Sequence, residues 1–278
     1  MKLYTSGGVT LLRSPLLPCP HGFSTRIGGI STLPHTASLN LGYGLGDDDE
    51  TVKENLSRFS SAVGVTASSV VSTKQVHGAT VLYCTEENQG DGYDRPAHEA
   101  DGSYTDRVGV TVAVKTADCV PILLCGCDDE KHPKAVMALH AGWRGTASEI
   151  VTVGVKQLSD LGIAKKNILA AIGPSIGICC YEVDDAFRET FFSRLSKDIL
   201  DGTFLPSETT EGKRYCDLKT INKRLLLASG IPEENIDVSS LCTACRQDLF
   251  YSHRASGGKR GSMLSMIALP GSAAVCCL

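Results

Sequence analysis

The chain has 278 residues, a hydrophobic content of 42% and a formal net charge of −4. This length and apolar content suffice for one large core, and we expect a single domain over residues 1–278. The basic residues are scattered, which predicts no binding of nucleic acid. No stretch resembles a signal peptide or has the ~18 uninterrupted apolar residues of a membrane helix, so we expect a cytoplasmic protein without membrane contact.

Three stretches share one pattern, in which helical residues precede a glycine, an apolar residue, a short polar turn and a strand. They begin at residues 59, 158 and 225, and their glycines are Gly64, Gly162 and Gly230. A glycine just past a helix relieves the left-handed strain that ends it. The pattern predicts αβ units whose strand ends converge on one face, although such connections also recur by chance in α/β proteins.

Residues that bind metals follow three of the predicted strands. His77 follows the strand of the first unit, Cys119 follows the apolar run 110–116, and His140 follows the run 135–139. Thiolate and imidazole are preferred zinc ligands, and three protein ligands leave the fourth position for water or substrate. The spacing alone does not show that the three side chains meet, and buried His and Cys are often structural.

The segment Leu139–Gly145 joins a buried strand to a predicted helix. Thr146 and Glu149 have the spacing of a capping box, which places the helix start directly after the segment. Helix N-termini at strand ends attract anions, and Arg144 adds a planar positive charge there. The alternative is a surface turn in which Trp143 covers the core.

Twelve cysteines in a chain without an export signal are expected to be mostly reduced thiols. Cys242 and Cys245 form a C-x-x-C motif, but a structural zinc site needs a second pair, and none is evident at comparable spacing. The ending Val275–Leu278 has valine where a prenylation box needs cysteine, which predicts an ordinary tail.

Several ordered blocks of the sequence resemble the laccase-domain family, whose bacterial members are also called multicopper polyphenol oxidases or purine nucleoside phosphorylases. The strongest blocks are Thr73–Gly78, Ala100–Gly102, Thr116–Pro121, His140–Gly145 and Ile172–Gly177, and residues 21–29, 38–41 and 179–183 extend the match. The closing segment departs from the family pattern, because it keeps Arg254 but has Ala255 in place of a second arginine. That departure puts substrate contacts of this segment in doubt.

The resemblance implies a catalytic domain with a four-layer α/β/β/α sandwich of mixed sheets. It also implies a zinc ion held by the residues corresponding to His77, Cys119 and His140. The implied chemistry is phosphorolysis of adenosine, inosine and methylthioadenosine, together with deamination of adenosine. The expected partners are therefore purine nucleosides and phosphate, and we expect a monomer or homodimer.

Further site residues are expected from this chemistry. Phosphate needs cations, for which Arg144 and Arg26 are candidates. Neutral amides suit base or ribose edges, and carboxylates can protonate the leaving purine or orient a ligand histidine. The amide candidates are Asn40 and Gln75, and the carboxylates are Asp101 and Asp118. The alternatives are a surface arginine for Arg26, structural amides and turn-capping aspartates.

Other functions remain open on the same residues. Cys119 as nucleophile and His140 as base suit an amide hydrolase or deamidase, and resemblance to bacterial relatives suggests a cell-wall precursor as substrate. Copper oxidation of phenols is disfavoured, because none of the seven histidines forms an H-x-H pair. A metal-stabilised binding module without catalysis is the remaining alternative.

Overall fold

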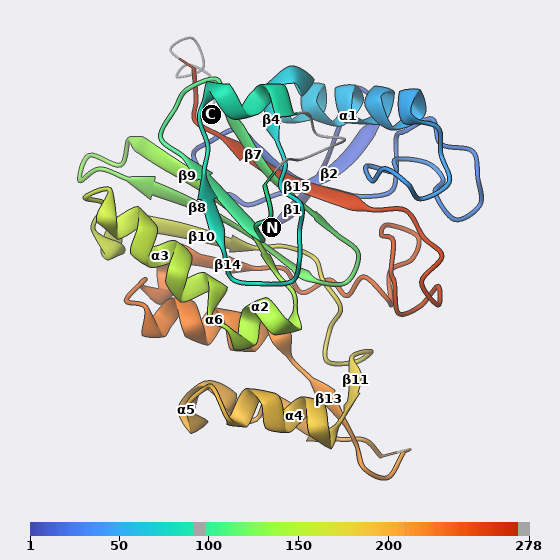
Figure 1. The fold of residues 1–278 in the computed structure, drawn as a ribbon, viewed down its shortest axis with the longest axis vertical. Helices are drawn as coiled ribbons and strands as arrows, with labels where there is room; N and C mark the ends of the chain where they lie inside the picture. The colour runs from blue at the N-terminus through green and yellow to red at the C-terminus, as the bar shows by residue number, and fades with distance from the viewer. Residues whose placement is uncertain (92–97, 209, 272–278) are drawn as a thin grey trace.

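Two six-stranded mixed sheets lie face to face in the computed structural model, which describes residues 1–91, 98–208 and 210–271 (Figure 1). The first sheet has the order β1 (Lys2–Ser6), β2 (Val9–Arg13), β3 (His21–Ser24), β15 (Met263–Ala268), β7 (Thr111–Thr116) and β4 (Val70–Val71). The second has the order β14 (Ile236–Val238), β10 (Ile168–Ile172), β8 (Val120–Cys127), β9 (Pro133–Ala141), β6 (Gly102–Thr105) and β5 (Val81–Tyr83). The central strands β7, β15, β8 and β9 are rich in apolar residues and largely buried, whereas the edge strand β1 is exposed.

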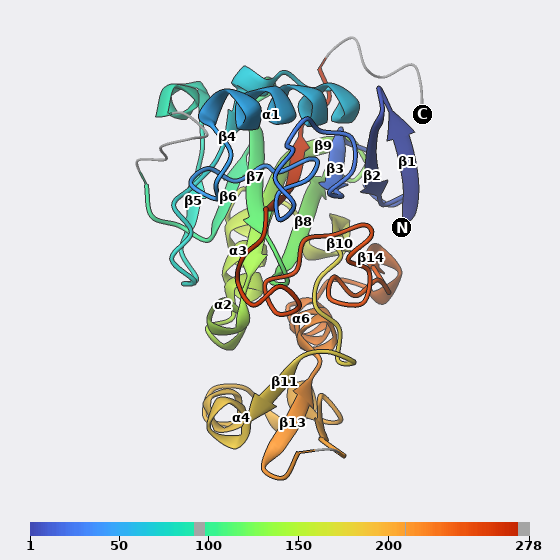
Figure 2. The same ribbon diagram turned by 90° about the vertical axis from the view of Figure 1, so that its right-hand side faces the viewer.

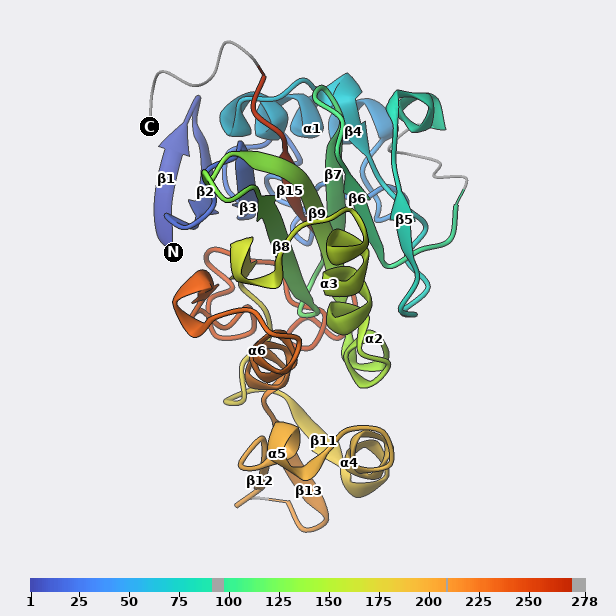
Figure 3. The ribbon, with the colours of Figure 1, turned by 90° about the vertical axis from the view of Figure 1, so that its left-hand side faces the viewer.

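Helices cover the outer face of each sheet (Figures 2 and 3). Helix α1 (Asp49–Val63) packs on the first sheet through Leu56 and Phe59, whereas α3 (Ile150–Asp160) and α6 (Leu218–Ala228) pack on the second. A third apolar cluster, including Phe23 and Leu123, fills the space between the sheets. The layers are therefore helix, sheet, sheet and helix, which confirms the predicted four-layer α/β/β/α sandwich.

A small extension lies beyond α6 (Figure 3). It consists of β11 (Glu182–Asp184), α4 (Asp185–Phe192), α5 (Lys197–Leu200), β12 (Phe204–Pro206) and β13 (Lys213–Cys216). Phe191 and Leu200 of this extension are buried in the same apolar cluster as the residues of α3 and α6. The extension thus shares the core of the main body.

The three predicted αβ units are confirmed. Helices α1, α3 and α6 are followed by Gly64, Gly162 and Gly230, with φ of 94°, 84° and 95°. Short 3₁₀ turns η1 (Ala67–Ser69), η3 (Lys165–Asn167) and η4 (Glu233–Asn235) then lead into β4, β10 and β14. A fourth 3₁₀ turn, η2 (Glu86–Asp91), follows β5. The glycine and the apolar residue after it therefore do mark the helix ends.

The predicted capping box is wrong. A short helix, α2 (Trp143–Ala147), begins directly after Gly142, and α3 begins only at Ile150, after Glu149 in a left-handed conformation without a side-chain cap. Thr146 lies inside α2, where its hydroxyl donates to the Ala141 carbonyl at 3.3 Å. The chain forms two helices with a break between them. Thr146 lies before this break and Glu149 lies directly before α3, so the T-x-x-E spacing does not cap one helix.

In the described part of the chain, no helix is long and apolar enough to span a bilayer. The tail Val275–Leu278 lies outside the described residues.

Candidate metal centre

The three predicted ligand residues come together at the ends of their strands. The ligand atoms of His77, Cys119 and His140 all lie within 4.8 Å of one another. The imidazole rings of His77 and His140 meet edge to face, with centroids 4.9 Å apart. His140 is buried, Cys119 is half-buried and His77 is exposed, so one side of the group is open to solvent. This arrangement can hold one metal ion and leave a coordination position accessible.

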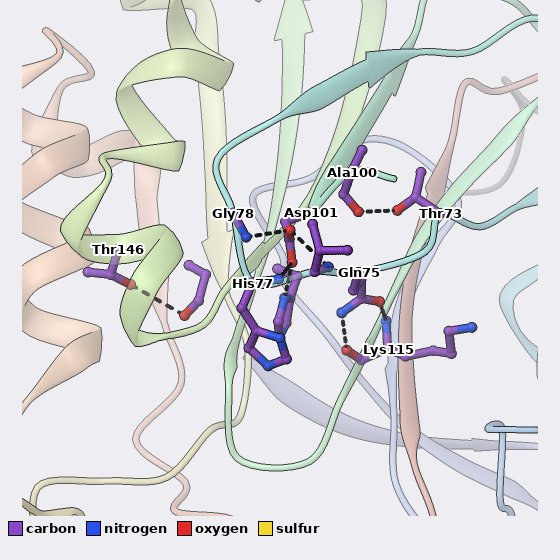
Figure 4. Close-up of polar contacts among 11 residues, drawn as sticks. Thr73, Gln75, His77, Gly78, Ala100, Asp101, Lys115 and Thr146 are labelled. Atoms are coloured by element: carbon purple, nitrogen blue, oxygen red, sulfur yellow. Dashed lines mark hydrogen bonds and ion pairs between the residues drawn. The ribbon is translucent and has the colours of Figure 1, made fainter. Parts of the chain in front are cut away.

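A buried carboxylate holds two of the ligand residues in place (Figure 4). Asp101 accepts a hydrogen bond from His140 Nδ1 at 2.8 Å and from the backbone N–H groups of Val76, His77 and Gly78 at 3.2, 2.9 and 2.6 Å. The bond to Nδ1 leaves Nε2 of His140 for a ligand. His77 has a φ of 62°, an unfavourable conformation outside glycine, and the Asp101 clamp holds its backbone there.

Because Gly142 has no side chain, it leaves room for the three ligand side chains to converge. A Cβ atom at this position would lie 3.2 Å from His77 Cδ2, 3.3 Å from Cys119 Sγ and 3.4 Å from His140 Cε1. Any larger residue would therefore push against all three ligand side chains. The backbone is close to the centre because Gly142 is the single residue between the end of β9 at Ala141 and the start of α2 at Trp143.

At neutral pH the metal-free site is a thiolate–imidazolium pair, in which Cys119 is in its metal-binding form and His140 must release a proton before it can bind. Burial raises the pKa of the Cys119 thiol, but hydrogen bonds with His140 and His77 outweigh burial and bring this pKa down to about 6. Burial lowers the pKa of His140, but Asp101 and Cys119 outweigh it and raise this pKa to about 9. At neutral pH the sulfur is therefore a thiolate, which is the form that binds metals and attacks carbonyl carbons.

A cavity of about 380 Å³ opens beside the ligand side chains. This volume is within the range of small-molecule sites. The lining contains both imidazoles and the Cys119 sulfur together with three cationic side chains, Lys74, Lys115 and Arg260. The cavity can therefore bring an anionic or polar ligand next to the metal-binding group.

The two predicted amide residues connect parts of the backbone. Both ends of the Gln75 amide bond the backbone of Lys115, at 2.8 Å each (Figure 4). The fully buried Asn40 amide bonds the N–H and carbonyl of Gly42, the N–H of Ser262 and the carboxylate of Asp47. Gln75 lines the cavity, whereas Asn40 is not part of the lining.

The two predicted arginines lie outside the cavity lining. Arg144 is exposed, and its guanidinium lies 4.3 Å from the centroid of the Trp143 ring. Arg26 lies over the Tyr251 ring at 4.7 Å and donates to the carbonyls of Ala37 and Gln247. It lines a neighbouring hollow that shares Arg260 with the cavity.

Asp118 adjoins Cys119 but turns its carboxylate toward another segment. It accepts hydrogen bonds from Thr243 Oγ1 at 2.6 Å, Ser252 Oγ at 3.0 Å and the Arg254 N–H at 2.7 Å. Its own φ of 90° is left-handed. Asp118 thus fixes the turn before Cys119, and a role in proton transfer stays a prediction, as it does for Asp101.

None of the three cationic residues of the cavity was among the predicted site residues, and two of them, Lys115 and Arg260, are at least half-buried. Lys115 interrupts an otherwise buried strand, and burial lowers its pKa. Arg260 is half-buried, and its Nε has no hydrogen-bond partner in the part of the chain that the structure describes. Lys115 could have been singled out from the sequence, because a lysine near the end of an apolar strand is unusual and lysine side chains are rarely buried.

Comparison with known proteins agrees with this geometry. Residues 20–270 match the model of the family described as multi-copper polyphenol oxidoreductase laccase. The chain belongs to this family. The resemblance inferred from the sequence blocks is therefore confirmed.

Relatives and solved structures cover almost all of the chain. "Purine nucleoside phosphorylase YlmD" of Geobacillus stearothermophilus is 39% identical over 254 residues, 88% of each chain. A "Purine nucleoside phosphorylase" of Deinococcus radiodurans is 36% identical over 269 residues, 96% of this chain and 95% of its own. The crystal structure of Bacillus licheniformis hypothetical protein YfiH has a TM-score of 0.86 at 34% identity, covering 96% of this chain and 99% of its own.

Proposed function

We propose that this chain is a zinc-dependent purine nucleoside phosphorylase that also deaminates adenosine. The observation that carries the proposal is the group His77, Cys119 and His140 at the wall of a cavity with cationic side chains. The names of the relatives support the phosphorylase part, because relatives that align along most of this chain carry that name.

The donor set fits zinc. One thiolate and two imidazoles are typical zinc donors, and in the described residues the group has three members, as catalytic zinc sites do. His140 is oriented by a carboxylate, as ligand histidines usually are. The space kept by Gly142 completes the fit. When bound, zinc supplies a Lewis acid that polarises oxygen and acidifies water.

The arginine that lines the cavity is Arg260, whereas the expected phosphate-binding residues Arg144 and Arg26 are not part of the lining. In phosphorolysis a phosphate oxygen forms a bond to C1′ of the ribose while the bond to the purine nitrogen breaks. Arg260 is suited to hold this phosphate, because it lines the cavity and its buried Nε has no hydrogen-bond partner among the described residues. Within the described residues, its side chain donates a hydrogen bond from Nη1 to the Gly261 carbonyl at 3.2 Å.

The test compares Arg260→Ala with Arg144→Ala. Adenosine turnover is followed with and without phosphate, since adenine reports phosphorolysis and inosine reports deamination. Loss of a charge-assisted contact of 2–3 kcal/mol predicts a ~10²-fold slower phosphorolysis for Arg260→Ala, with deamination largely retained. We expect little change for Arg144→Ala.

The contrary outcomes separate the hypotheses. A selective loss in Arg144→Ala would favour the anion site inferred from the sequence. Equal loss of both reactions in Arg260→Ala would assign that residue a structural role. Zinc-loaded wild-type protein that converts adenosine in neither reaction would refute the proposed function.

A second candidate is a cysteine-type amide hydrolase. It is favoured by the order Cys119, His140 and Asp101, in which a carboxylate orients the imidazole beside a thiol. Amide hydrolysis by this route needs no metal and is blocked by alkylation of Cys119. Activity on a cell-wall peptide amide that survives removal of zinc would support it, and activity restored only by zinc would exclude it.

A further inference from the structure

A second group of cysteines converges on the other side of the Cys119 turn. The sulfur atoms of Cys179, Cys180, Cys242 and Cys245 all lie within 4.8 Å of one another. Cys245 Sγ is 3.5 Å from Cys179 Sγ and 3.3 Å from Cys180 Sγ. The sequence has no evident second pair at comparable spacing, as expected, but the structure brings a pair of different spacing to the C-x-x-C motif. Adjacent cysteines supply that pair, and a search for equal spacing does not find them.

The sheet topology brings the two pairs together. Strands β10 and β14 are parallel neighbours, so the segments that follow them leave the same edge of the sheet. An isolated parallel bridge between Ser175 and Cys242 continues this pairing. The first segment then turns sharply, with the N–H groups of Cys180 and Tyr181 bonded to the Gly177 carbonyl. That turn points both adjacent cysteines at the C-x-x-C motif.

The spacing of the sulfurs suits a single tetrahedral ion. Zinc–sulfur bonds of ~2.3 Å place the sulfurs of a tetrahedral site about 3.8 Å apart. The separations of 3.5 and 3.3 Å from Cys245 Sγ are close to this value, and all four sulfurs lie within 4.8 Å of one another. A Cβ at Gly177 would lie 3.2 Å from Cys179 Sγ and from Cys242 Cβ, so glycine keeps this space open.

Two further features stabilise negative charge at this group. Cys242 Sγ accepts a hydrogen bond from the Gly177 N–H at 3.1 Å, and the N–H groups of Cys245 and Ala244 also donate to it. Lys219 is buried beside the group, and its ammonium donates to the carbonyls of Ser239 and Leu241 at 3.0 Å each. Four thiolates around a divalent cation keep a net negative charge, which a buried ammonium offsets.

We propose that Cys179, Cys180, Cys242 and Cys245 bind a structural zinc ion that joins the segments after β10 and β14. An S₄ donor set with four protein ligands is the closed type of zinc site. The same segment carries Thr243, whose hydroxyl bonds Asp118 beside Cys119. The second ion therefore also fixes the turn that presents Cys119 to the cavity.

The test uses a background in which the first site is disabled. In His140→Ala, zinc measured by mass spectrometry reports mainly the cysteine group, whatever the activity of the enzyme. We expect one zinc per chain in His140→Ala and none in His140→Ala with Cys242→Ser. Cys84→Ala in the same background is the control, because Cys84 is buried away from this group and should not change the zinc content. Zinc that is absent from His140→Ala, or unaffected by Cys242→Ser, would overturn the proposal.

Two further measurements complement the zinc content, and the second uses only the intact wild-type protein. Cobalt in place of zinc should give the intense sulfur-to-metal absorption of a tetrathiolate site, and His140→Ala should keep it. Without reductant, peptide mapping should find Cys179, Cys180, Cys242 and Cys245 as free thiols after denaturation. A disulfide from Cys245 to Cys179 or Cys180 would overturn the proposal.

Discussion

Replacement of Asp101 by asparagine should weaken metal binding by changing the tautomer of His140. Asp101 Oδ1 accepts from His140 Nδ1 and the His77 N–H, and Oδ2 accepts from the N–H groups of Val76 and Gly78. Asparagine keeps one oxygen, so in either orientation it loses two of these four hydrogen bonds. If its NH₂ group donates to Nδ1, the imidazole proton must move to Nε2, the nitrogen left for the metal.

The size of both effects follows from these contacts. Hydrogen bonds to a charged group contribute about 1.5–3 kcal/mol each, so losing two should lower the free energy of unfolding of the metal-free protein by about 3–6 kcal/mol. Loss of an orienting partner of a ligand histidine typically lowers metal affinity 10–100-fold. We expect zinc affinity of Asp101→Asn to fall within that range, measured by competition with a chromogenic chelator.

Asp47→Asn is the matched control. Asp47 accepts three hydrogen bonds, from Ser31, Thr36 and Asn40, at 2.7–2.9 Å, against the four that Asp101 accepts, and none of its three donors is a ligand residue. It should lower stability without changing zinc affinity. Unchanged zinc affinity in Asp101→Asn, or an equal loss in Asp47→Asn, would refute the orienting role of Asp101.

Three further outcomes follow from the structure. Gly142→Ala should lower zinc affinity about tenfold, because its Cβ lies against all three ligands. Gly162→Ala should leave that affinity unchanged and lower the unfolding free energy by about 1 kcal/mol, because φ is 84° in open space. Burial lowers the pKa of His21 to about 4, so below pH 6.5 the unfolded chain binds a proton that the folded chain does not. Stability should therefore fall by about 3 kcal/mol from pH 6.5 to 4, and chemical denaturation of His21→Gln should show a shallower acid loss.

The ligand group could be predicted because its positions depend on strand ends. His77 and Cys119 follow the parallel neighbours β4 and β7, and His140 lies at the end of β9 in the facing sheet, so all three positions depend mainly on where strands end. The three glycines that follow helices could also be predicted from the sequence, because the left-handed conformation after a helix depends only on local residues.

The phosphate-binding residues could not be predicted in the same way. The direction of a long side chain depends on its neighbours, and Arg144 lies on the Trp143 ring rather than at the cavity. Arg260 reaches the cavity from a segment more than a hundred residues away in the chain from any ligand. The adjacent pair Cys179 and Cys180 was missed for a related reason, because only the pairing of β10 with β14 brings it to Cys242.

The polar residues around the ligands connect the segments that carry them. Gln75 joins the His77 segment to β7, Asp101 holds the same segment to His140, and Asp118 joins the Cys119 turn to Thr243. Each is buried or half-buried and bonded through its side chain, so removing one should shift a ligand rather than remove a reacting group. Substitutions there should therefore reduce phosphorolysis and deamination by similar factors. Only a residue that contacts phosphate, such as Arg260 in the proposed function, should separate the two reactions, because phosphate takes part in one of them alone.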